Sequence, residues 1–298
     1  MSGLCSEVEA SRPEFDRNFM PTITKTPNPS FKPGQGLNDL VGSEWFCLDV
    51  DVKANEIIFT QPCAGEFQPN EAKWKSITPE EQAGGDVYKM MISGITPRPI
   101  AFVSSMGSDG KANLAPMSYF AAVGHNPPTI MISVAAGKLT DGLKDTSHNI
   151  KETKEFCVSI ISEPFLEAAN FTSIDAPYNV DEWALSGLTQ RPSETVKPPH
   201  VAESAFTMEC EVLHWYDLIG DKGKPTQAVI LGKIKRFQVA NQMKVLTEKL
   251  RPMSRLGGIS YARSTQMVEI PRPVWDQVKN TPEVKEALDQ GPRKTTEK

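Results

Sequence analysis

Short apolar runs separated by turn-forming residues dominate the middle of the chain. A continuous apolar run at 100–103 predicts a strand that is covered on both faces. Residues 108–111 (Ser-Asp-Gly-Lys) supply the turn of a hairpin, and the return strand is expected over 112–120. Further β-rich runs follow at 129–134 and 156–161, with the breaker His-Asn-Pro-Pro before the first of them. These runs predict a series of neighbouring strands.

The second half of the chain continues the strand pattern. Apolar and polar residues alternate from 206 to 212, which predicts a strand with one buried and one wet face. The turn sequence at 220–223 then leads into a second long strand over 228–239.

Helices are predicted to be few and short. Asp145 is a plausible N-cap for a helix that ends near Thr153, and residues 164–171 predict a second helix. Many strands with only short helices favour a barrel over a doubly wound sheet. The fold class is therefore predicted as mainly β, a β-barrel with short helices.

The N-terminal region differs from this middle part. Residues 1 to about 40 are rich in Pro, Asn and Gly without sustained periodicity, so a loosely held arm is expected. The apolar pieces at 46–48 and 57–59 predict a short strand pair. The glycine pair at 84–85 precedes the compact part of the chain.

Composition excludes several classes of function. The chain has 298 residues, 39% hydrophobic and 23% charged, which is ordinary for a soluble globular protein. Its net charge of −5 argues against a nucleic-acid partner, since such proteins carry a basic footprint. No apolar run reaches the roughly 20 residues that cross a bilayer, and residues 1–19 lack the apolar block of a signal peptide. A cytoplasmic protein without a membrane partner is expected.

The five cysteines are odd in number and scattered, with no CxxC pair and no Cys/His spacing of zinc-ligand type. Cys157 and Cys210 fall in apolar strand patterns and are predicted to be buried thiols. The four histidines also lack metal-ligand spacing, so no metal site is predicted. Ser118 has no GxSxG context, and Gly34-Gln35-Gly36 has neither the strand nor the helix of a dinucleotide fingerprint.

The return strand of the first hairpin mixes small, polar and aromatic residues where a core strand would be apolar. Ala115 and Pro116 would keep its surface low, and a proline stops one edge from pairing. A flat ring could then approach the backbone, with the hydroxyls of Ser104, Ser105 and Ser118 nearby. A kinked edge strand would carry the same residues and remains the alternative.

The segment 137–146 leaves a strand, passes two lysines and enters a helix N-terminus, where unpaired N–H groups and the helix dipole suit a phosphate. Lys138 and Lys144 would neutralise the phosphate, and Thr146 could donate its hydroxyl. An ordinary solvated loop before a capped helix is the alternative. A flat surface for a ring and an anion site one strand further on together suit a mononucleotide better than either feature does alone.

A succession of motifs then points to a family. In order, the chain carries 91–104, 109–120 with Asn-Leu-Ala-Pro, the Asn126-Pro127-Pro128 turn, Lys144-Asp145-Thr146 with Asn149-Ile150, 155–160, Glu203-Ser204 with Glu209-Cys210, Leu231-Gly232 and 255–263. This succession resembles the flavin-reductase-like family of FMN-binding split barrels, and most of all its fungal flavoredoxin-type members with a similar N-terminal extension. The likeness implies an N-terminal extension over 1–83, a split-barrel domain over 84–273 and a polar C-terminal tail over 274–298.

The resemblance also implies a site and a function. Flavin contacts carry over to Ser104, Ser105, Asn113, Ala115, Pro116, Met117 and Ser118, and phosphate contacts to Lys138, Lys144 and Thr146. The expected cofactor is FMN, with FAD as an alternative, and NADH or NADPH is the expected hydride donor. The expected assembly is a homodimer, with an oxygenase or reductase as a further partner.

We expect an FMN-dependent oxidoreductase of the NAD(P)H:flavin reductase type. The flavin itself performs the redox reaction, so no acid–base pair essential for flavin reduction is expected. Two alternatives stay open: a non-enzymatic flavin-binding electron carrier, and a tailoring oxidoreductase that acts on an organic substrate in a biosynthetic pathway.

Overall fold

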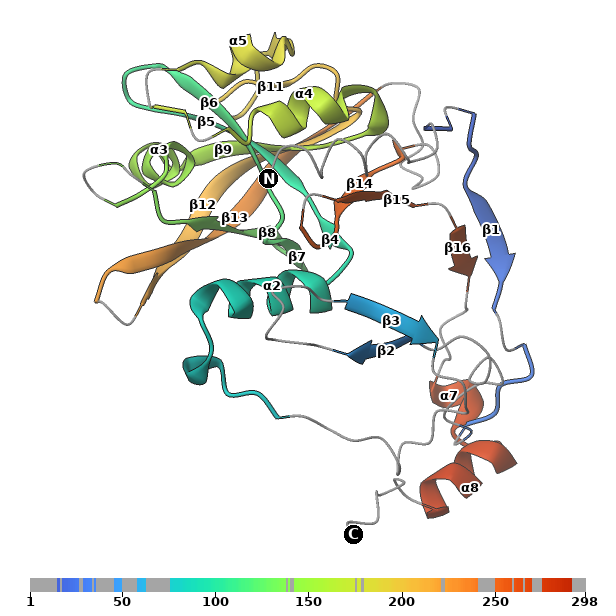
Figure 1. Ribbon diagram of the computed structural model, residues 1–298. Helices are drawn as coiled ribbons and strands as arrows, with labels where there is room; N and C mark the ends of the chain where they lie inside the picture. The colour runs from blue at the N-terminus through green and yellow to red at the C-terminus, as the bar shows by residue number, and fades with distance from the viewer. Residues whose placement is uncertain are drawn as a thin grey trace. The chain divides into compact units, whose positions relative to one another are not determined.

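The computed structural model divides the chain into two compact units, one of residues 1–88 with 265–298 and one of residues 89–264 (Figure 1). The structure describes residues 15–16, 18–26, 29–33, 35, 46–49, 58–62, 76–137, 139, 142–174, 176–177, 180–220, 223–240, 250–258, 260–264, 266–269 and 275–290.

A seven-stranded antiparallel sheet forms the larger unit. Its strands, in spatial order, are β6 (Ala112–Met117), β5 (Ala101–Met106), β9 (Glu155–Ile160), β12 (Phe206–Ile219), β13 (Pro225–Val239), β8 (Pro128–Ala135) and β7 (Phe120–His125). The two edge strands, β6 and β7, are neighbours in sequence, with only Ser118 and Tyr119 between them. The sheet must therefore curl until its edges approach, which makes a barrel split between β6 and β7 and confirms the mainly β prediction.

The core lies on both faces of this sheet. Successive side chains of a strand point to opposite faces, so Val103 packs into the interior cluster with Phe156 and Ile230. Its neighbour Phe102 packs into a second cluster with Leu114. The predicted strand at 100–103 is indeed buried on both faces.

The helices of the larger unit cover the ends and the outer face of the barrel. α3 (Asp145–Thr153) contacts β5, while α4 (Leu166–Phe171) and α5 (Glu182–Ser186) contact β6. The predicted N-cap of the first helix is wrong by one residue, because Lys144 has the extended backbone of the cap and Asp145 is already helical. A 3₁₀ turn, η2 (Glu163–Phe165), precedes α4 within the predicted second helix.

Short strands complete the larger unit. β4 (Arg98–Pro99), β14 (Met253–Arg255) and β15 (Tyr261–Arg263) form a three-stranded sheet, and β10 (Gln190–Arg191) pairs with β11 (His200–Val201).

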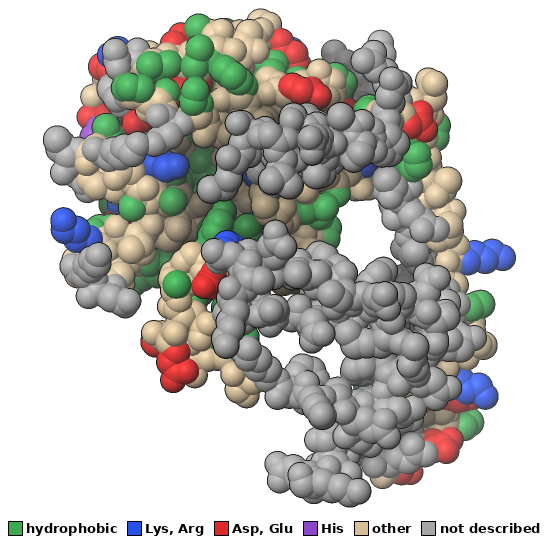
Figure 2. Space-filling view, in the orientation of Figure 1, with side chains coloured by type: hydrophobic (Ala, Val, Ile, Leu, Met, Phe, Trp, Pro, Cys, Tyr) green, Lys and Arg blue, Asp and Glu red, His purple; other side chains and the backbone are tan. Residues whose placement is uncertain are grey.

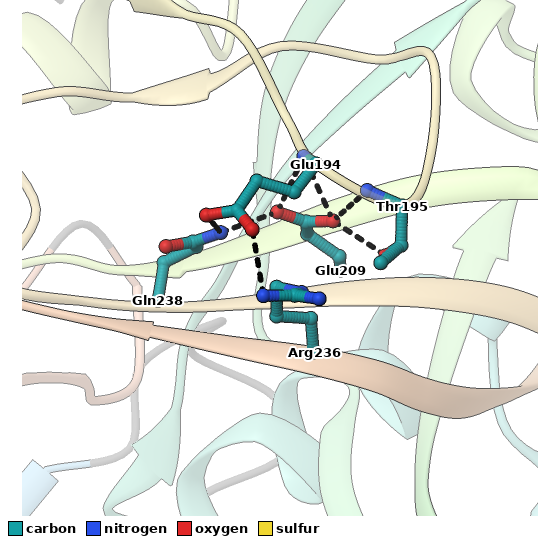
Figure 3. Close-up of polar contacts among 5 residues, drawn as sticks. All are labelled: Glu194, Thr195, Glu209, Arg236 and Gln238. Atoms are coloured by element: carbon teal, nitrogen blue, oxygen red, sulfur yellow. Dashed lines mark hydrogen bonds and ion pairs between the residues drawn. The ribbon is translucent and has the colours of Figure 1, made fainter.

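A buried carboxylate fixes the loop between β10 and β11 (Figure 3). Glu209 of β12 is fully buried and accepts hydrogen bonds from the Thr195 backbone N at 2.6 Å and the Thr195 hydroxyl at 2.5 Å. The Glu194 backbone N and Gln238 Nε2 also donate to it, at 3.0 and 2.8 Å. Burial raises the pKa of Glu209, but these hydrogen bonds outweigh burial and hold its pKa below the ordinary value.

Cys157 and Cys210 are buried free thiols, as predicted. Burial raises the pKa of Cys157 to about 12 and that of Cys210 well above its ordinary value, so both stay protonated and unreactive.

Within its described residues, the smaller unit holds two strand pairs. β1 (Thr22–Lys25) pairs in parallel with β16 (Gln266–Glu269), and β2 (Phe46–Asp49) pairs antiparallel with β3 (Ile58–Pro62). The predicted pair at 46–48 and 57–59 is confirmed. The region predicted as a loosely held arm thus contains one strand, β1, which the pattern did not predict, because a four-residue strand gives little periodicity and its partner β16 lies far away in sequence.

The remaining elements are helical: η1 (Pro79–Glu81), α2 (Gly84–Gly94), α7 (Trp275–Val278) and α8 (Pro282–Gln290). The glycine pair at 84–85 thus opens a helix that the sequence pattern did not predict. Among the described residues, no helix has the length and apolar character needed to span a membrane. On the face shown in Figure 2, charged side chains of both signs are interspersed over the described surface.

Candidate functional site

The candidate site lies where α3 covers the hairpin of β5 and β6. The Thr146 hydroxyl, in the first turn of α3, donates a 2.8 Å hydrogen bond to Oδ1 of Asn113 on β6. One turn further along α3, Asn149 Nδ2 donates to the Ser105 hydroxyl at 3.3 Å. All four side chains are buried. The structure therefore brings together three residues that the sequence singled out, Ser105, Asn113 and Thr146.

Strand alternation distributes the other hairpin residues over two faces. Ala115 pairs with Val103 and shares the interior face with Asn113, and Met117 packs against the interior cluster. Pro116 pairs with Phe102 on the outer face. β6 is an edge strand of the sheet, so one side of its backbone pairs with no other strand of the described sheet, and Ala115, Pro116 and Met117 are half-buried. A ring could meet this segment along its edge.

The buried hydroxyl of Ser104 also lies on the outer face, opposite Leu114, and has no hydrogen-bond partner in the described part of the chain. A hydroxyl without a partner in the interior is costly. The neighbouring Ser105 differs, since it accepts from Asn149.

Ser118 is held by an arginine that sequence reasoning did not assign to the site. Arg98 Nε donates to the Ser118 hydroxyl at 3.2 Å. The same buried guanidinium donates to the carbonyls of Ile92 at 2.6 Å, Ile95 at 2.8 Å and Leu256 at 3.0 Å. Arg98 thus fixes the point where β6 passes to β7. Its signal was the Arg-Pro pair at the start of the hairpin, which was read only as part of the resemblance.

The loop before α3 closes on itself at Gly137. The Gly137 N–H donates to the carbonyl of Gly142 at 2.9 Å, and a Cβ at Gly137 would lie 2.2 Å from the Leu143 carbonyl oxygen. Only glycine fits this approach without moving the backbone. Lys144 follows as the N-cap, where its side chain forms no capping hydrogen bond and is exposed. Lys138 lies outside the described residues.

An acidic pocket adjoins Asn113. Glu182 of α5 accepts a 3.2 Å hydrogen bond from Asn113 Nδ2, so the one amide links α3, β6 and α5. The pocket has a volume of about 390 Å³ and is lined by Met106, Gly110, Lys111, Ala112, Asn113, Asp145, Asn149, Val180, Asp181, Glu182 and Gln190. Sequence reasoning missed Glu182 because α5 was not predicted.

Burial sets the electrostatics of this pocket. It raises the pKa of Asp145, and it raises the pKa of Glu182 with help from the nearby carboxylates of Asp145 and Asp181. For Glu182, hydrogen bonds that include the one from Asn113 oppose the shift without cancelling it.

Comparison with known proteins identifies the family. Residues 93–251 match the model of the flavin reductase like domain. The chain belongs to the flavin-reductase-like family. An uncharacterised protein of Halalkalibacterium halodurans is 35% identical over 206 residues, which cover 67% of this chain and 98% of that protein.

Solved structures of this flavin-reductase-like type agree in fold. Nitrilotriacetate monooxygenase component B from Bacillus cereus is 38% identical, with a TM-score of 0.63, over 67% of this chain and all of that one. The 2-nitrobenzoate 2-nitroreductase of Pseudomonas fluorescens is 27% identical, with a TM-score of 0.58, over 67% of this chain and 98% of that one. The predicted flavin-reductase-like split barrel is confirmed.

Proposed function

We propose that this flavin-reductase-like protein is an FMN-dependent oxidoreductase that takes hydride from NADH or NADPH and passes it to a bound or exchangeable flavin. One observation carries the proposal: the 38% identity to a monooxygenase component B over that protein's whole length. By analogy with that component, a separate oxygenase is the proposed consumer of the reduced flavin.

The residues of the candidate site fit a flavin phosphate. The N-cap of α3 is a lysine whose side chain does not cap the helix. A helix N-terminus offers backbone N–H groups and a positive dipole end to an anion. Lys144, with Lys138, would supply positive charge. The Thr146 hydroxyl already donates to Asn113, so its role here is to hold the first turn of the helix against β6. When bound, the flavin supplies reversible two-electron chemistry.

The hairpin residues would hold the isoalloxazine ring. We place the ring along the edge of β6 where no described strand pairs, against Ala115, Pro116 and Met117, with Ser118 fixed by Arg98 at the end of the strand. Ser105 and Asn113 support this segment from the interior face through their bonds to Asn149, Thr146 and Glu182. Ser104, also in the proposed set, lies on the outer face. Their work is to orient the ring and exclude water, so no general acid or base is assigned.

A second candidate has its own support. The likeness to a 2-nitrobenzoate 2-nitroreductase favours an enzyme that keeps its flavin and reduces an organic substrate on it. Flavin retention separates the candidates, because a reductase that supplies a partner must release reduced flavin.

We further propose that the protein is a homodimer. The long strand β12 leaves Tyr216 and Leu218, which point to the same face by strand alternation, exposed at 63% and 44% of their surface. Exposed apolar side chains gathered on one element mark an interaction surface, and a two-fold contact between identical copies is the commonest solution. Sedimentation of the full chain tests this, and a monomer at micromolar concentration would contradict it.

The proposed function is tested with the purified full-length protein. Its absorbance spectrum should show flavin, or added FMN should lose fluorescence on binding. NADH or NADPH should then be oxidised in the presence of FMN. A carrier would bind flavin without turnover, and a nitroreductase would retain flavin through gel filtration and consume a nitroarene. A colourless protein that does not quench flavin fluorescence would refute all three.

A further inference from the structure

The acidic pocket beside Asn113 has a chemistry that flavin binding does not explain. Three of its lining residues are carboxylates, Asp145, Asp181 and Glu182, against one lysine, Lys111. That lysine is exposed, and its ammonium group is 3.5 Å from a carboxylate oxygen of Asp109. A phosphate would be repelled here, whereas a group that donates hydrogen bonds would be accepted.

A buried amide gives independent support for a ligand. Asn149 lines the pocket and is only 1% exposed. Its Nδ2 donates to Ser105, but within the described part of the chain its Oδ1 has no hydrogen-bond partner. An unsatisfied buried acceptor is costly, and a ligand donor would remove that cost. Among the described residues no group of three or more His, Cys, Asp or Glu side chains can hold a metal ion, so the donor is sought in an organic ligand.

We propose that this pocket binds the adenosine ribose of the nicotinamide dinucleotide and makes the enzyme select NADH over NADPH, with Glu182 as the specificity-determining residue. The inference rests on the proposed function, which requires such a donor. A carboxylate accepts hydrogen bonds from ribose hydroxyls, and it repels the 2′-phosphate that distinguishes NADPH. The pocket volume of about 390 Å³ suits part of a dinucleotide.

Glu182 is placed for this role by its neighbours. Asn113 Nδ2 donates to Oε2 of Glu182, which orients the carboxylate. Each carboxylate oxygen can accept more than one hydrogen bond, so a ribose hydroxyl can still bind there. Asp181 has a different task, since its Oδ1 accepts from the backbone N–H groups of Trp183 and Ala184 and caps α5. Substitution of Glu182 therefore tests recognition with less damage to the helix.

The first experiment measures binding without turnover. Calorimetry on the full-length protein compares ADP-ribose with 2′-phospho-ADP-ribose, and we expect ADP-ribose to bind at least about tenfold tighter. Glu182→Gln should reduce this ratio of the affinity for ADP-ribose to that for 2′-phospho-ADP-ribose several-fold. The matched control is Glu167→Gln, which removes the same charge from an exposed position on α4 and should leave the ratio unchanged. An equal narrowing in both variants would overturn the proposal, because net charge alone would then explain it.

A second variant adds a charge instead of removing one. Gln190 is exposed on β10 at the edge of the pocket, so Gln190→Lys should raise the affinity for 2′-phospho-ADP-ribose about tenfold. No gain in a variant that melts like the wild-type protein would overturn the assignment. Binding of the diamine putrescine with no binding of either nucleotide would also overturn it, and would identify a cation site.

Kinetics separate this inference from the function on which it rests. The ratio of kcat/KM for NADH to that for NADPH should exceed about tenfold in the wild type and fall in Glu182→Gln. Turnover with neither nucleotide would contradict the proposed function itself. Turnover with a ratio that Glu182→Gln leaves unchanged would contradict only the role of the pocket.

Discussion

The hydroxyl of Thr146 and the side-chain carbonyl of Asn113, 2.8 Å apart, join the first turn of α3 to the edge strand β6. Both residues are buried, with 3% and 9% of their surface exposed. The proposed phosphate site and the proposed ring site are therefore mechanically linked. The amide nitrogen of Asn113 also donates a hydrogen bond to Glu182, so α5 is joined to the same strand.

Loss of this hydrogen bond should destabilise the barrel. Thr146→Val keeps the shape of the side chain but leaves Asn113 Oδ1 without a donor, at a cost of about 1–3 kcal/mol. Thr146→Ser keeps the hydroxyl and should lose much less. Urea unfolding of the two variants checks this, and equal stabilities would show that the hydroxyl contributes nothing.

The lysines before α3 should discriminate between flavins. Lys138→Glu combined with Lys144→Glu should weaken FMN far more than riboflavin, because only FMN carries the phosphate. Each lost charge-assisted contact should cost about 1.5–3 kcal/mol. Lys197→Glu combined with Lys224→Glu, at two exposed positions, is the charge-matched control. Fluorescence quenching measures both affinities, and equal weakening of FMN and riboflavin would place the phosphate elsewhere.

Local patterns explain why the barrel could be predicted. The apolar run at 100–103 and the alternation at 206–212 each extend over enough residues to show a period. Burial on both faces follows directly for β5. The predicted wet face at the start of β12 is wrong, because Thr207 bonds to Ser159 and Glu209 bonds to Thr195, and both polar side chains are buried.

The parts that could not be predicted depend on contacts between distant residues. β1 exists because it pairs with β16, and Glu182 enters the pocket because the five-residue helix α5 lies against β6. Neither segment is long enough to show a pattern. Arg98 bonds to nearby residues but also to Ser118 and Leu256, which lie far from it in sequence and meet it only in the folded chain.

The buried carboxylate of Glu209 should contribute to stability mainly above its ordinary pKa of 4.5. Its pKa is lowered in the folded state, so its contribution is present above pH 4.5 and is lost as the pH falls through the lower, folded value. Glu209→Ala leaves the Thr195 N–H and Gln238 Nε2 without their acceptor, at a cost of roughly 2–4 kcal/mol at pH 7.

The pH dependence and a neighbouring residue provide the controls. The stability difference between wild type and Glu209→Ala should shrink as urea unfolding is repeated below pH 4.5. Glu211→Gln, on the same strand, removes an exposed carboxylate that pairs with Lys235 at 2.9 Å. It should destabilise the protein much less than Glu209→Ala, because an exposed ion pair contributes little to stability. A difference that stays constant with pH would mean that the charge of Glu209 is not the source of its effect.

Glu182 should show the opposite pH dependence. Its pKa is raised on folding, so between the ordinary value of 4.5 and the raised value the folded protein binds more protons than the unfolded chain. Stability contributed by this group therefore falls as the pH rises through that window, and stays reduced above it.

Glu182→Gln removes the charge and keeps an oxygen that can accept from Asn113. Its melting temperature should exceed that of the wild type at pH 7, and the excess should fade as the pH falls below 4.5. Glu167→Gln should show no such trend. A Glu182→Gln protein that is less stable than wild type at pH 7 would mean that the folded protein favours the ionised carboxylate, which contradicts the raised pKa of Glu182.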